Sequence, residues 1–285
     1  MGSTPGAAAI AALIDRTIDT TVPEPFGAYL FLDGDPAAEI ARSVEREVFL
    51  EAFGNTAELL ATEYGPYEPS SLFVCVVDHR ARRPAGAMRL IVPTPGGPGL
   101  KSLNDLEPTW GAPATALLSR LGIAPPPGGM WDIATLAVAP AYRTAAATGL
   151  VSLGLYQSVV RTAGAAGIEW LCAILDVTVF RMTRAKFAGP FDPITDPRPY
   201  LGSPSSVPVT CDLVAWRARL SGRDQLLCET IYDGLGIEAA LRPLPLTVAA
   251  GLSETLVRGG GAAPVSRPTP VGSTVPGGSR AERAR

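Results

Sequence analysis

The chain has 285 residues, of which 47% are hydrophobic and 18% are charged, which predicts a globular protein with a substantial core. Its net charge of −3 at pH 7 argues against nucleic acid as the main partner. No apolar run is long enough to span a bilayer, and the early apolar run at 7–14 follows no Lys or Arg, so it makes a poor signal peptide. We therefore expect a cytoplasmic protein.

The metal-binding and nucleophilic residue types are few. The four cysteines (Cys75, Cys172, Cys211 and Cys228) are scattered without a CxxC pair, which predicts buried thiols. The single histidine, His79, lies in a charged hairpin connection and is expected on the surface. A metal site and a serine or cysteine triad are both disfavoured, because either would depend on that histidine. We expect no metal.

Three regions precede the first predicted hairpin. Residues 1–24 are small and Thr-rich, and we expect a flexible N-terminal segment there. The apolar run 28–32 predicts a short strand. Residues 37–53 show apolar side chains on one face of a helix, with Pro36 in its first turn and Gly54 at its end. Thr56 is then expected to cap a shorter helix.

The middle of the chain predicts a sheet. Residues 71–78 and 85–92 are apolar runs joined by a charged loop, which is typical of an antiparallel hairpin. A Pro/Gly loop and a short helix at 115–121 lead to a strand at 131–138. A turn of small residues, a long helix and a strand at 168–175 follow. A helix N-terminus fed by such a turn presents backbone N–H groups and is a ready anion site.

The last part of the chain predicts a helix at 177–187, an irregular Pro-rich stretch at 189–208, a strand at 209–216 and a helix at 224–235. From the composition we expect one domain over residues 25–250 and a disordered Gly/Pro/Ser/Arg-rich tail at 251–285. The order of elements indicates an α/β (α+β) protein with a mixed sheet.

The segment from Leu136 to Arg143, LAVAPAYR, resembles the strand and lead-in to the phosphate-binding turn of the GNAT superfamily of N-acyltransferases. Ala146 and Thr148 stand where that turn has glycines. The sequence looks most like the autoinducer-synthase branch and its long-chain N-acyl amino acid synthase relatives. This closer resemblance is carried by three segments, 46–49 (REVF), 86–90 (GAMRL) and 132–138 (DIATLAV).

The resemblance implies a mixed, mostly antiparallel sheet flanked by helices, with a splayed central strand pair. It implies an enzyme that moves an acyl group from acyl-coenzyme A or acyl-carrier protein to an amine of a small molecule or amino acid. It also implies a set of donor-binding residues on the strand and the turn: Leu136, Ala137, Val138, Arg143, Thr144, Ala145, Ala146, Ala147, Thr148 and Gly149.

The acceptor amine must lose a proton, so carboxylates near the strand tips are candidate catalytic residues. These are Asp132 and Asp176, with Glu45 on the first long helix as a further candidate; Asp176 is also readable as a helix N-cap. Tyr200, in the Pro-rich stretch, could serve as the acid to the departing thiolate, but a lone tyrosine in a loop is also readable as a packing residue. Arg46, Phe49 and Arg89 are implied to bind substrate, although Arg89 is equally readable as a solvated strand residue.

Other interpretations stay open. The basic residues around 80–83 and 181–186 are a solvated face, a docking surface for an acyl-carrier protein, or a site for the adenosine phosphate of coenzyme A. The chain could be a catalytically inactive GNAT-like module that binds a ligand or a partner, because a fold does not specify a reaction. A Rossmann-like methyltransferase built on GAAGIEWLCAILD is a weaker alternative, since its glycines precede the strand.

Overall fold

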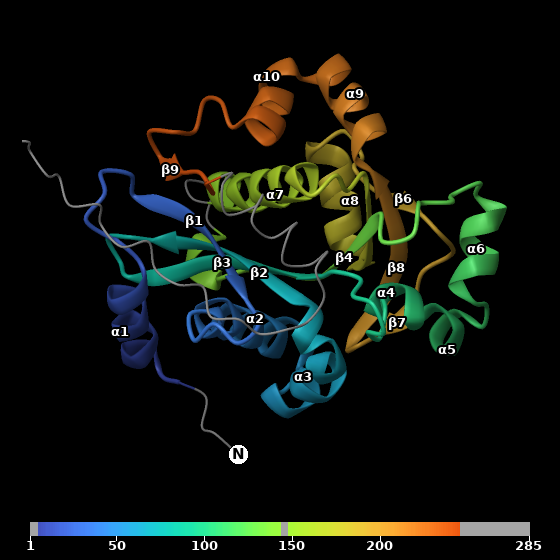
Figure 1. Ribbon diagram of the computed structural model, residues 1–285, viewed down its shortest axis with the longest axis horizontal. Helices are drawn as coiled ribbons and strands as arrows, with labels where there is room; N and C mark the ends of the chain where they lie inside the picture. The colour runs from blue at the N-terminus through green and yellow to red at the C-terminus, as the bar shows by residue number, and fades with distance from the viewer. Residues whose placement is uncertain (1–4, 144–147, 246–285) are drawn as a thin grey trace, which may run out of the picture.

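The computed structural model describes residues 5–143 and 148–245, and in them the chain is built around a nine-stranded sheet (Figure 1). The strand order is β6-β8-β5-β4-β3-β2-β1-β9, and β7 pairs with β8 beside this path. The strands are β1 (Phe26–Leu32), β2 (Ser71–Asp78), β3 (Arg83–Ile91), β4 (Met130–Val138), β5 (Trp170–Asp176), β6 (Asp192–Pro193), β7 (Arg198–Tyr200), β8 (Ser203–Asp212) and β9 (Leu241–Arg242).

Most neighbouring strands in the sheet run antiparallel. Only β4 with β5 and β1 with β9 are parallel pairs among the described strands. The parallel pair at the centre follows from the connection, because the long helix between β4 and β5 returns the chain to the same end of the sheet. The mixed, mostly antiparallel sheet predicted from the sequence is confirmed.

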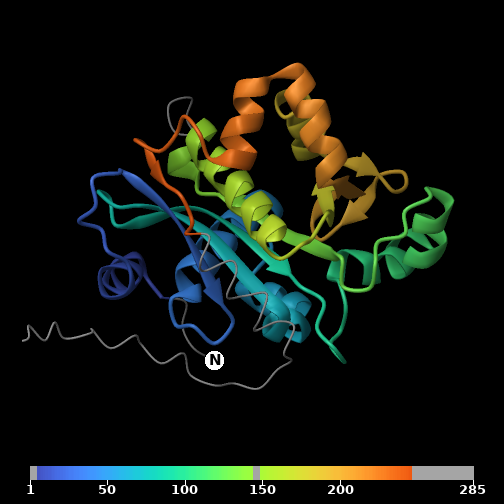
Figure 2. The ribbon, with the colours of Figure 1, turned by 45° about the horizontal axis from the view of Figure 1, so that its top comes forward.

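Helices cover both faces of the sheet, as Figures 1 and 2 show together. One face is packed by α2 and the other by α7. The helices are α1 (Ala7–Thr17), α2 (Ala38–Phe53), α3 (Ala57–Tyr64), α4 (Lys101–Asn104), α5 (Leu106–Trp110), α6 (Ala114–Arg120), α7 (Thr148–Ala165), α8 (Val177–Lys186), α9 (Leu213–Arg223) and α10 (Gln225–Cys228), with 3-10 turns at Gly65–Ser70 and Pro140–Tyr142 and a π-helical turn at Glu229–Asp233.

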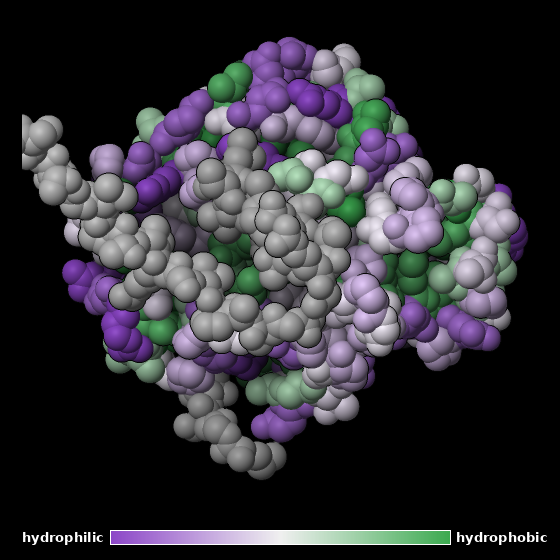
Figure 3. Space-filling model, in the orientation of Figure 1, coloured by the Kyte–Doolittle hydropathy of each residue, from purple (hydrophilic) through white to green (hydrophobic). Residues whose placement is uncertain are grey.

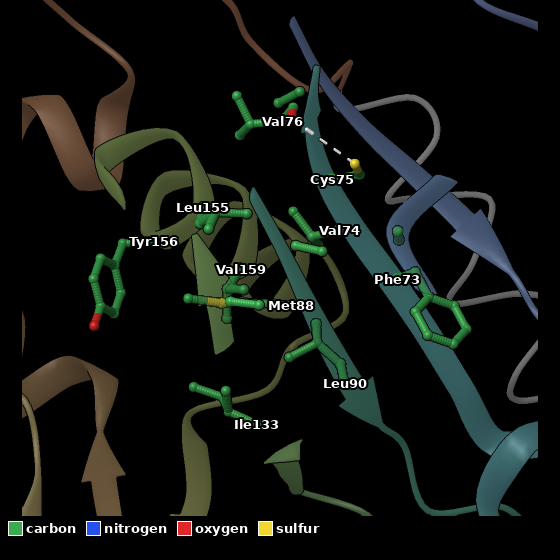
Figure 4. Packing of buried hydrophobic residues seen from close by; sticks show 14 of the residues in the cluster. Phe73, Val74, Cys75, Val76, Met88, Leu90, Ile133, Leu155, Tyr156 and Val159 are labelled. Carbon is green, nitrogen blue, oxygen red and sulfur yellow. Dashed lines mark hydrogen bonds between the residues drawn. The ribbon is translucent and has the colours of Figure 1, made fainter. Parts of the chain in front are cut away.

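The main core extends over both faces of the sheet, and Figure 4 shows the part between α7 and the central strands. Leu155 and Val159 of α7 pack there with Met88 of β3 and Val74 of β2, and each is at most 1% exposed. Seven of the eight residues of β2 are buried, because helices cover both of its faces. The central strands are therefore held on two sides, which fixes the positions of the side chains at their tips.

The connection from β3 to β4 forms a small lobe of its own. Its helices α4, α5 and α6 enclose a separate cluster around Leu106, Trp110 and Leu117, to which Ile194 beside β6 contributes. The Trp110 indole N–H donates to the backbone oxygen of Asp196 at 2.8 Å, which ties the lobe to the chain before β7. In Figure 3 this lobe lies at the right, where hydrophobic side chains show among hydrophilic ones.

Three local predictions differ from the structure. The expected flexible N-terminal segment contains helix α1, because Ile10 and Ile14 are four residues apart and bury one helix face. The strand expected at 209–216 ends at Asp212, whose side chain accepts from the backbone N–H of Ala215 at 2.9 Å and begins α9. His79 is 3% exposed and contacts Tyr29, so it is not a surface residue.

The four cysteines are buried free thiols, as predicted. No helix among residues 5–143 and 148–245 combines the length and the apolar character needed to cross a lipid bilayer. The expected tail at 251–285 lies outside the described residues.

Candidate functional site

The central parallel strands separate partway along their length. The pairing of β4 with β5 ends at Asp132 and Cys172, although the strands continue to Val138 and Asp176. Beyond this point the facing edges no longer bond to each other, so backbone donors and acceptors line an opening in the sheet. This is the splayed central strand pair expected from the sequence.

A bulge in β4 lies at the point where the strands separate. Arg89 of β3 is opposite Thr135, and the next residue, Leu90, is opposite Ile133, so Ala134 is the extra residue. A bulge bends its strand and re-aims the neighbouring side chains and backbone groups. The Tyr64 hydroxyl donates to the Ala134 carbonyl at 3.3 Å, which gives the bulged peptide a partner on α3.

The opening is a cleft with a cavity volume of about 80 Å³. Its strand walls are apolar and come from both separated strands, whereas aromatic side chains from α2, α3 and β7 form the rest of the lining. The strand residues are Ile133, Leu136, Ile174 and Leu175, and the aromatic residues are Phe49, Phe53, Tyr64 and Tyr200. Thr135, Asp176, Ser203 and Ser206 supply polar groups.

The turn between β7 and β8 closes this cleft against the end of α2. The Asn55 side-chain amide donates to the backbone oxygen of Leu201 at 3.1 Å. Gly202 lies so close to α2 that a Cβ atom there would be 2.5 Å from the Phe53 carbonyl oxygen. Gly202 also has a φ of 83°, so glycine is required on both counts.

A buried ion pair lies between α2 and strands β3 and β4. The Arg89 guanidinium donates to both carboxylate oxygens of Glu45, from Nε at 2.9 Å and from Nη2 at 2.7 Å. Both side chains are at most 4% exposed. Glu68 pairs with the remaining Arg89 nitrogen, Nη1, at 2.7 Å, so the guanidinium is saturated on three sides.

This ion pair is coupled to the cleft through the bulge. The Thr135 hydroxyl donates to Glu45 at 2.7 Å and accepts from the Arg89 backbone N–H at 3.3 Å. The guanidinium also lies 4.7 Å from the centroid of the Tyr64 ring, a cation–π distance. Although burial opposes the charge, Glu45 and Glu68 outweigh it and raise the pKa of Arg89. The guanidinium therefore keeps its charge, and Glu45 links it to Thr135 beside the bulge.

A second charged cluster lies where the β3–β4 lobe meets the cleft. The Lys101 ammonium donates to Glu63 at 2.8 Å, to Asp105 at 2.6 Å and to the Tyr200 hydroxyl at 3.3 Å. The Tyr200 hydroxyl in turn donates to Asp105. Burial, with the nearby Tyr64 and Asp105, raises the pKa of Tyr200 well above its usual value. Tyr200 is therefore a protonated phenol at the cleft wall.

Asp132 does not face the cleft. It is fully buried, and its two oxygens accept from the backbone N–H and the hydroxyl of Ser102, both at 2.7 Å. Burial raises the pKa of Asp132 to about 6, although the Ser102 hydrogen bonds oppose the shift. Its carboxylate therefore ties the first turn of α4 to β4.

Asp176 lines the cleft and also caps a helix. Its carboxylate accepts from the Thr178 backbone N–H at 2.7 Å at the start of α8, and from the Ser203 hydroxyl at 2.8 Å. Partial burial opposes ionisation, but these hydrogen bonds outweigh it and lower the pKa of Asp176. The structure therefore agrees with the interpretation of Asp176 as the N-cap of α8.

Of the predicted donor-binding residues that the structure describes, Leu136 to Val138 lie on β4, and Arg143 follows the 3-10 turn after it. Leu136 lines the cleft, and Ala137 pairs with Ala87 of β3. The Arg143 guanidinium bonds to the Val138 carbonyl at 2.9 Å and to Glu51 at 2.9 Å. Helix α7 begins at Thr148, followed by Gly149. Residues 144–147 and the Thr148 side chain lie outside the described part of the structure.

The predicted substrate-binding residues are divided between different places. Phe49 lines the cleft, whereas Arg89 lies behind β4 with Glu45. The alternative of a solvated Arg89 is wrong, because its side chain is 3% exposed. Arg46 pairs with Glu39 and lines a hollow of about 720 Å³ between α1, α2 and the β2–β3 turn. That hollow is larger than the cleft but contains none of the separated strand edges, so volume alone does not identify the site.

Sequence reasoning missed two of the four aromatic lining residues, Phe53 and Tyr64. Phe53 is four residues from Phe49 on α2, and that spacing could have placed the two rings on one helix face. Tyr64 is brought to the cleft by long-range packing, and no local pattern signals it; Tyr200, the tyrosine of the Pro-rich stretch, does line the cleft. Among the described residues, no group of three or more His, Cys, Asp and Glu side chains could hold a metal ion.

No protein-family model and no curated protein matches the sequence, but solved structures share its architecture. FeeM, an N-acyl amino acid synthase from uncultured soil microbes, is 16% identical with a TM-score of 0.50, over 70% of this chain and 96% of FeeM. BjaI, a CoA-dependent acyl-homoserine lactone synthase solved with SAM and isopentyl-CoA, is also 16% identical with a TM-score of 0.50, over 81% of this chain and 98% of BjaI. The chain has a GNAT-like fold. At these identities the likeness is one of fold, and at that level the predicted resemblance to the autoinducer-synthase branch is confirmed.

Proposed function

We propose that the protein is an N-acyltransferase that moves an acyl group from acyl-coenzyme A or acyl-carrier protein to an amine of a small molecule or amino acid. The observation that carries the proposal is the opening between β4 and β5, with a bulge at its origin and aromatic walls. Two synthases of the same fold, FeeM and BjaI, support an acyl donor and a small amine acceptor.

In the proposed complex the donor thioester enters along β4, with its pantetheine arm beside Leu136 to Val138. Its pyrophosphate lies at the N-terminus of α7, near Arg143 and Gly149, where helix N–H groups favour an anion. Arg143 must exchange its contact with Glu51 for the phosphate. The thioester carbonyl then lies at the bulge, where backbone N–H groups on the open edge of β4 stabilise its developing negative charge.

The reaction forms a bond between the amine nitrogen and the thioester carbonyl carbon and breaks the carbon–sulfur bond. One proton must pass from the amine to the departing thiolate. Tyr200 is the acid we assign to the thiolate, because its hydroxyl lies at the cleft wall, where the Lys101 ammonium donates to it and would stabilise the phenolate left after proton transfer. Glu63 and Asp105 lie beside the same edge of the cleft, and we propose that one of their carboxylates accepts the proton that the amine loses.

The earlier candidates Asp132, Asp176 and Glu45 have positioning roles in this proposal. Asp132 and Glu45 are buried and bonded to Ser102 and Arg89, and Asp176 holds the α8 N-terminus. Glu63 and Asp105 also bind Lys101, but their side chains are 30% and 21% exposed and so remain open to a substrate. The engagement of Asp132, Glu45 and Asp176 favours the alternative function, a GNAT-like module that binds an acyl ligand or a partner without turning it over. The two functions differ because only the transferase releases the free thiol of the donor.

The test begins with isothermal titration against acyl-coenzyme A thioesters and acyl-carrier protein. Thiol release is then measured over a panel of amines. Binding with thiol release supports the transferase, and binding without release across the panel supports the inactive module. Binding by none of the donors refutes the transferase and the acyl-binding module, and leaves a module that binds a partner.

Tyr200→Phe tests the assigned acid. It should lower kcat by about 10²- to 10⁴-fold with donor affinity kept, because the general acid is lost. Tyr232→Phe is the matched control, since that hydroxyl donates to Leu213 away from the cleft. Equal kcat for Tyr200→Phe and the wild type would remove Tyr200 from the reaction.

A further inference from the structure

The cleft is small, and this limits the length of the acyl chain that the proposed donor can carry. Its cavity volume is about 80 Å³. A protein cavity of about 150 Å³ holds benzene, which has six carbon atoms, so this cleft has room for about three carbon atoms. A fatty acyl chain would have to pass through the wall or remain in water.

The wall is made of rings that support one another. Phe49 and Phe53 lie on one face of α2, with ring centroids 5.6 Å apart in an edge-to-face arrangement. Tyr64 is 2% exposed and lies under the Arg89 guanidinium. Tyr200 packs against Trp110, with centroids 5.9 Å apart, and its hydroxyl is held by Asp105. Because each ring has partners behind it, opening the end of the cleft requires more than one rotamer change.

The backbone seals the space between these rings. The Leu201–Gly202 turn is bonded to Asn55, and Gly202 lies against the carbonyl oxygen of Phe53. Leu201 has a φ of 42°, so this turn is held in the left-handed region by its contacts. A closed backbone contact cannot yield to a long chain as a flexible side chain could.

We propose that this site selects donors with a short acyl group of about two to four carbon atoms, and that Phe53 is the residue that sets the limit. The inference rests on the proposed function and adds the class of donor. Phe53 is chosen because its ring lines the cleft and is only partly buried, whereas its contribution to the closing turn comes from its backbone oxygen. Truncating the ring lengthens the pocket without breaking the turn.

The expected result follows from the burial of methylene groups. Each methylene that enters an apolar pocket tightens binding about fourfold, and one that stays in water adds nothing. Dissociation constants measured by titration should therefore fall about fourfold per carbon from acetyl- to propionyl- to butyryl-coenzyme A. They should then stay constant or rise for hexanoyl-, octanoyl- and lauroyl-coenzyme A.

In Phe53→Ala the dissociation constant should continue to fall up to hexanoyl- or octanoyl-coenzyme A. In Phe53→Leu it should continue to fall over fewer added carbons. The smaller change is included because it keeps most of the packing if the alanine variant does not fold. Leu50→Ala is the matched control, since Leu50 is on the same helix, is 56% exposed and does not line the cleft. Its profile should equal that of the wild type.

The outcomes separate the inference from the function on which it rests. Affinity that keeps rising to octanoyl or lauroyl in the wild type overturns the short-chain limit and leaves the acyltransferase proposal standing. A short-chain limit that both Phe53 variants leave unchanged overturns the assignment of Phe53. Binding of no thioester of any length overturns both proposals together.

Discussion

Replacing Asp132 with Asn should change how the stability of the protein depends on pH. The carboxyl is fully buried, and its pKa is raised from 3.8 to about 6 by that burial. The folded state therefore binds a proton that the unfolded state has already lost between these two values. The shift of about two pKa units corresponds to about 3 kcal/mol, with no reduction for solvent screening because the group has no exposure.

The sign is set by the raised pKa. Below pH 3.8 both states are protonated and the contribution is fully present; as the pH rises through about 6 the folded state must ionise a buried group and the contribution is lost. The Asn side chain keeps an oxygen that can accept from Ser102 but has no proton to lose. The free energy of unfolding of the wild type, relative to Asp132→Asn, should fall by about 3 kcal/mol between about pH 4 and pH 7.5.

Urea unfolding followed by circular dichroism at several pH values measures this difference. Asp15→Asn is the control, because that carboxylate is exposed and contacts Arg82 at 3.3 Å on the surface. Subtracting the free energy of unfolding of Asp132→Asn from that of the wild type at each pH cancels the contribution of the other carboxylates. A difference that is constant over the range, or that grows as the pH rises, would refute the reasoning about burial. A large loss of turnover with unchanged stability would instead return Asp132 to the catalytic residues.

Three further changes test the supports of the cleft. Glu45→Gln should destabilise the fold by about 3–5 kcal/mol in urea unfolding, because Arg89 would keep a buried charge without its main partner; a loss below about 1 kcal/mol would contradict the buried pair. Asp176→Ala should cost about 1 kcal/mol through the loss of the α8 cap, and Asp176→Asn much less; equal losses would argue against capping. Gly202→Ala should lower Tm by several degrees, since its Cβ would overlap the Phe53 carbonyl and φ is 83°; an unchanged Tm would show that the turn moves freely.

Much of the fold follows from local signals. The helix at α2 and the strands β2 and β4 fall within a few residues of the predicted ranges, because each has a strong period or a continuous apolar run. Thr56 caps α3, accepting from the Leu59 N–H at 3.2 Å, as its position before the helix indicated. These features depend on neighbours in sequence, which is why sequence reasoning reaches them.

The site is less accessible to such reasoning because its contacts are distant in sequence. Arg89 and Glu45 are 44 residues apart, and Lys101 and Tyr200 are 99 apart. No local pattern distinguishes a solvated strand arginine from a buried one. Here Arg89 is buried because Glu45, on the helix α2 that packs against β3, pairs with it. The α9 helix was missed for a similar reason, since the apolar run after Thr210 continues through the capping residue Asp212.

The two charged clusters have one effect in common, which explains why they lie where they do. A buried ion pair adds little net stability, because desolvation cancels most of the attraction, but it strongly disfavours other arrangements of its partners. The Arg89–Glu45 pair is bonded to Thr135 beside the bulge and lies under Tyr64, and the Lys101–Asp105 pair is bonded to Tyr200. Each cluster thus fixes one tyrosine wall and one side of the opening. The charges therefore contribute more to the shape of the cleft than to the stability of the fold. We expect that a substitution that weakens either cluster lets the cleft bind longer acyl chains under conditions in which the protein is still folded.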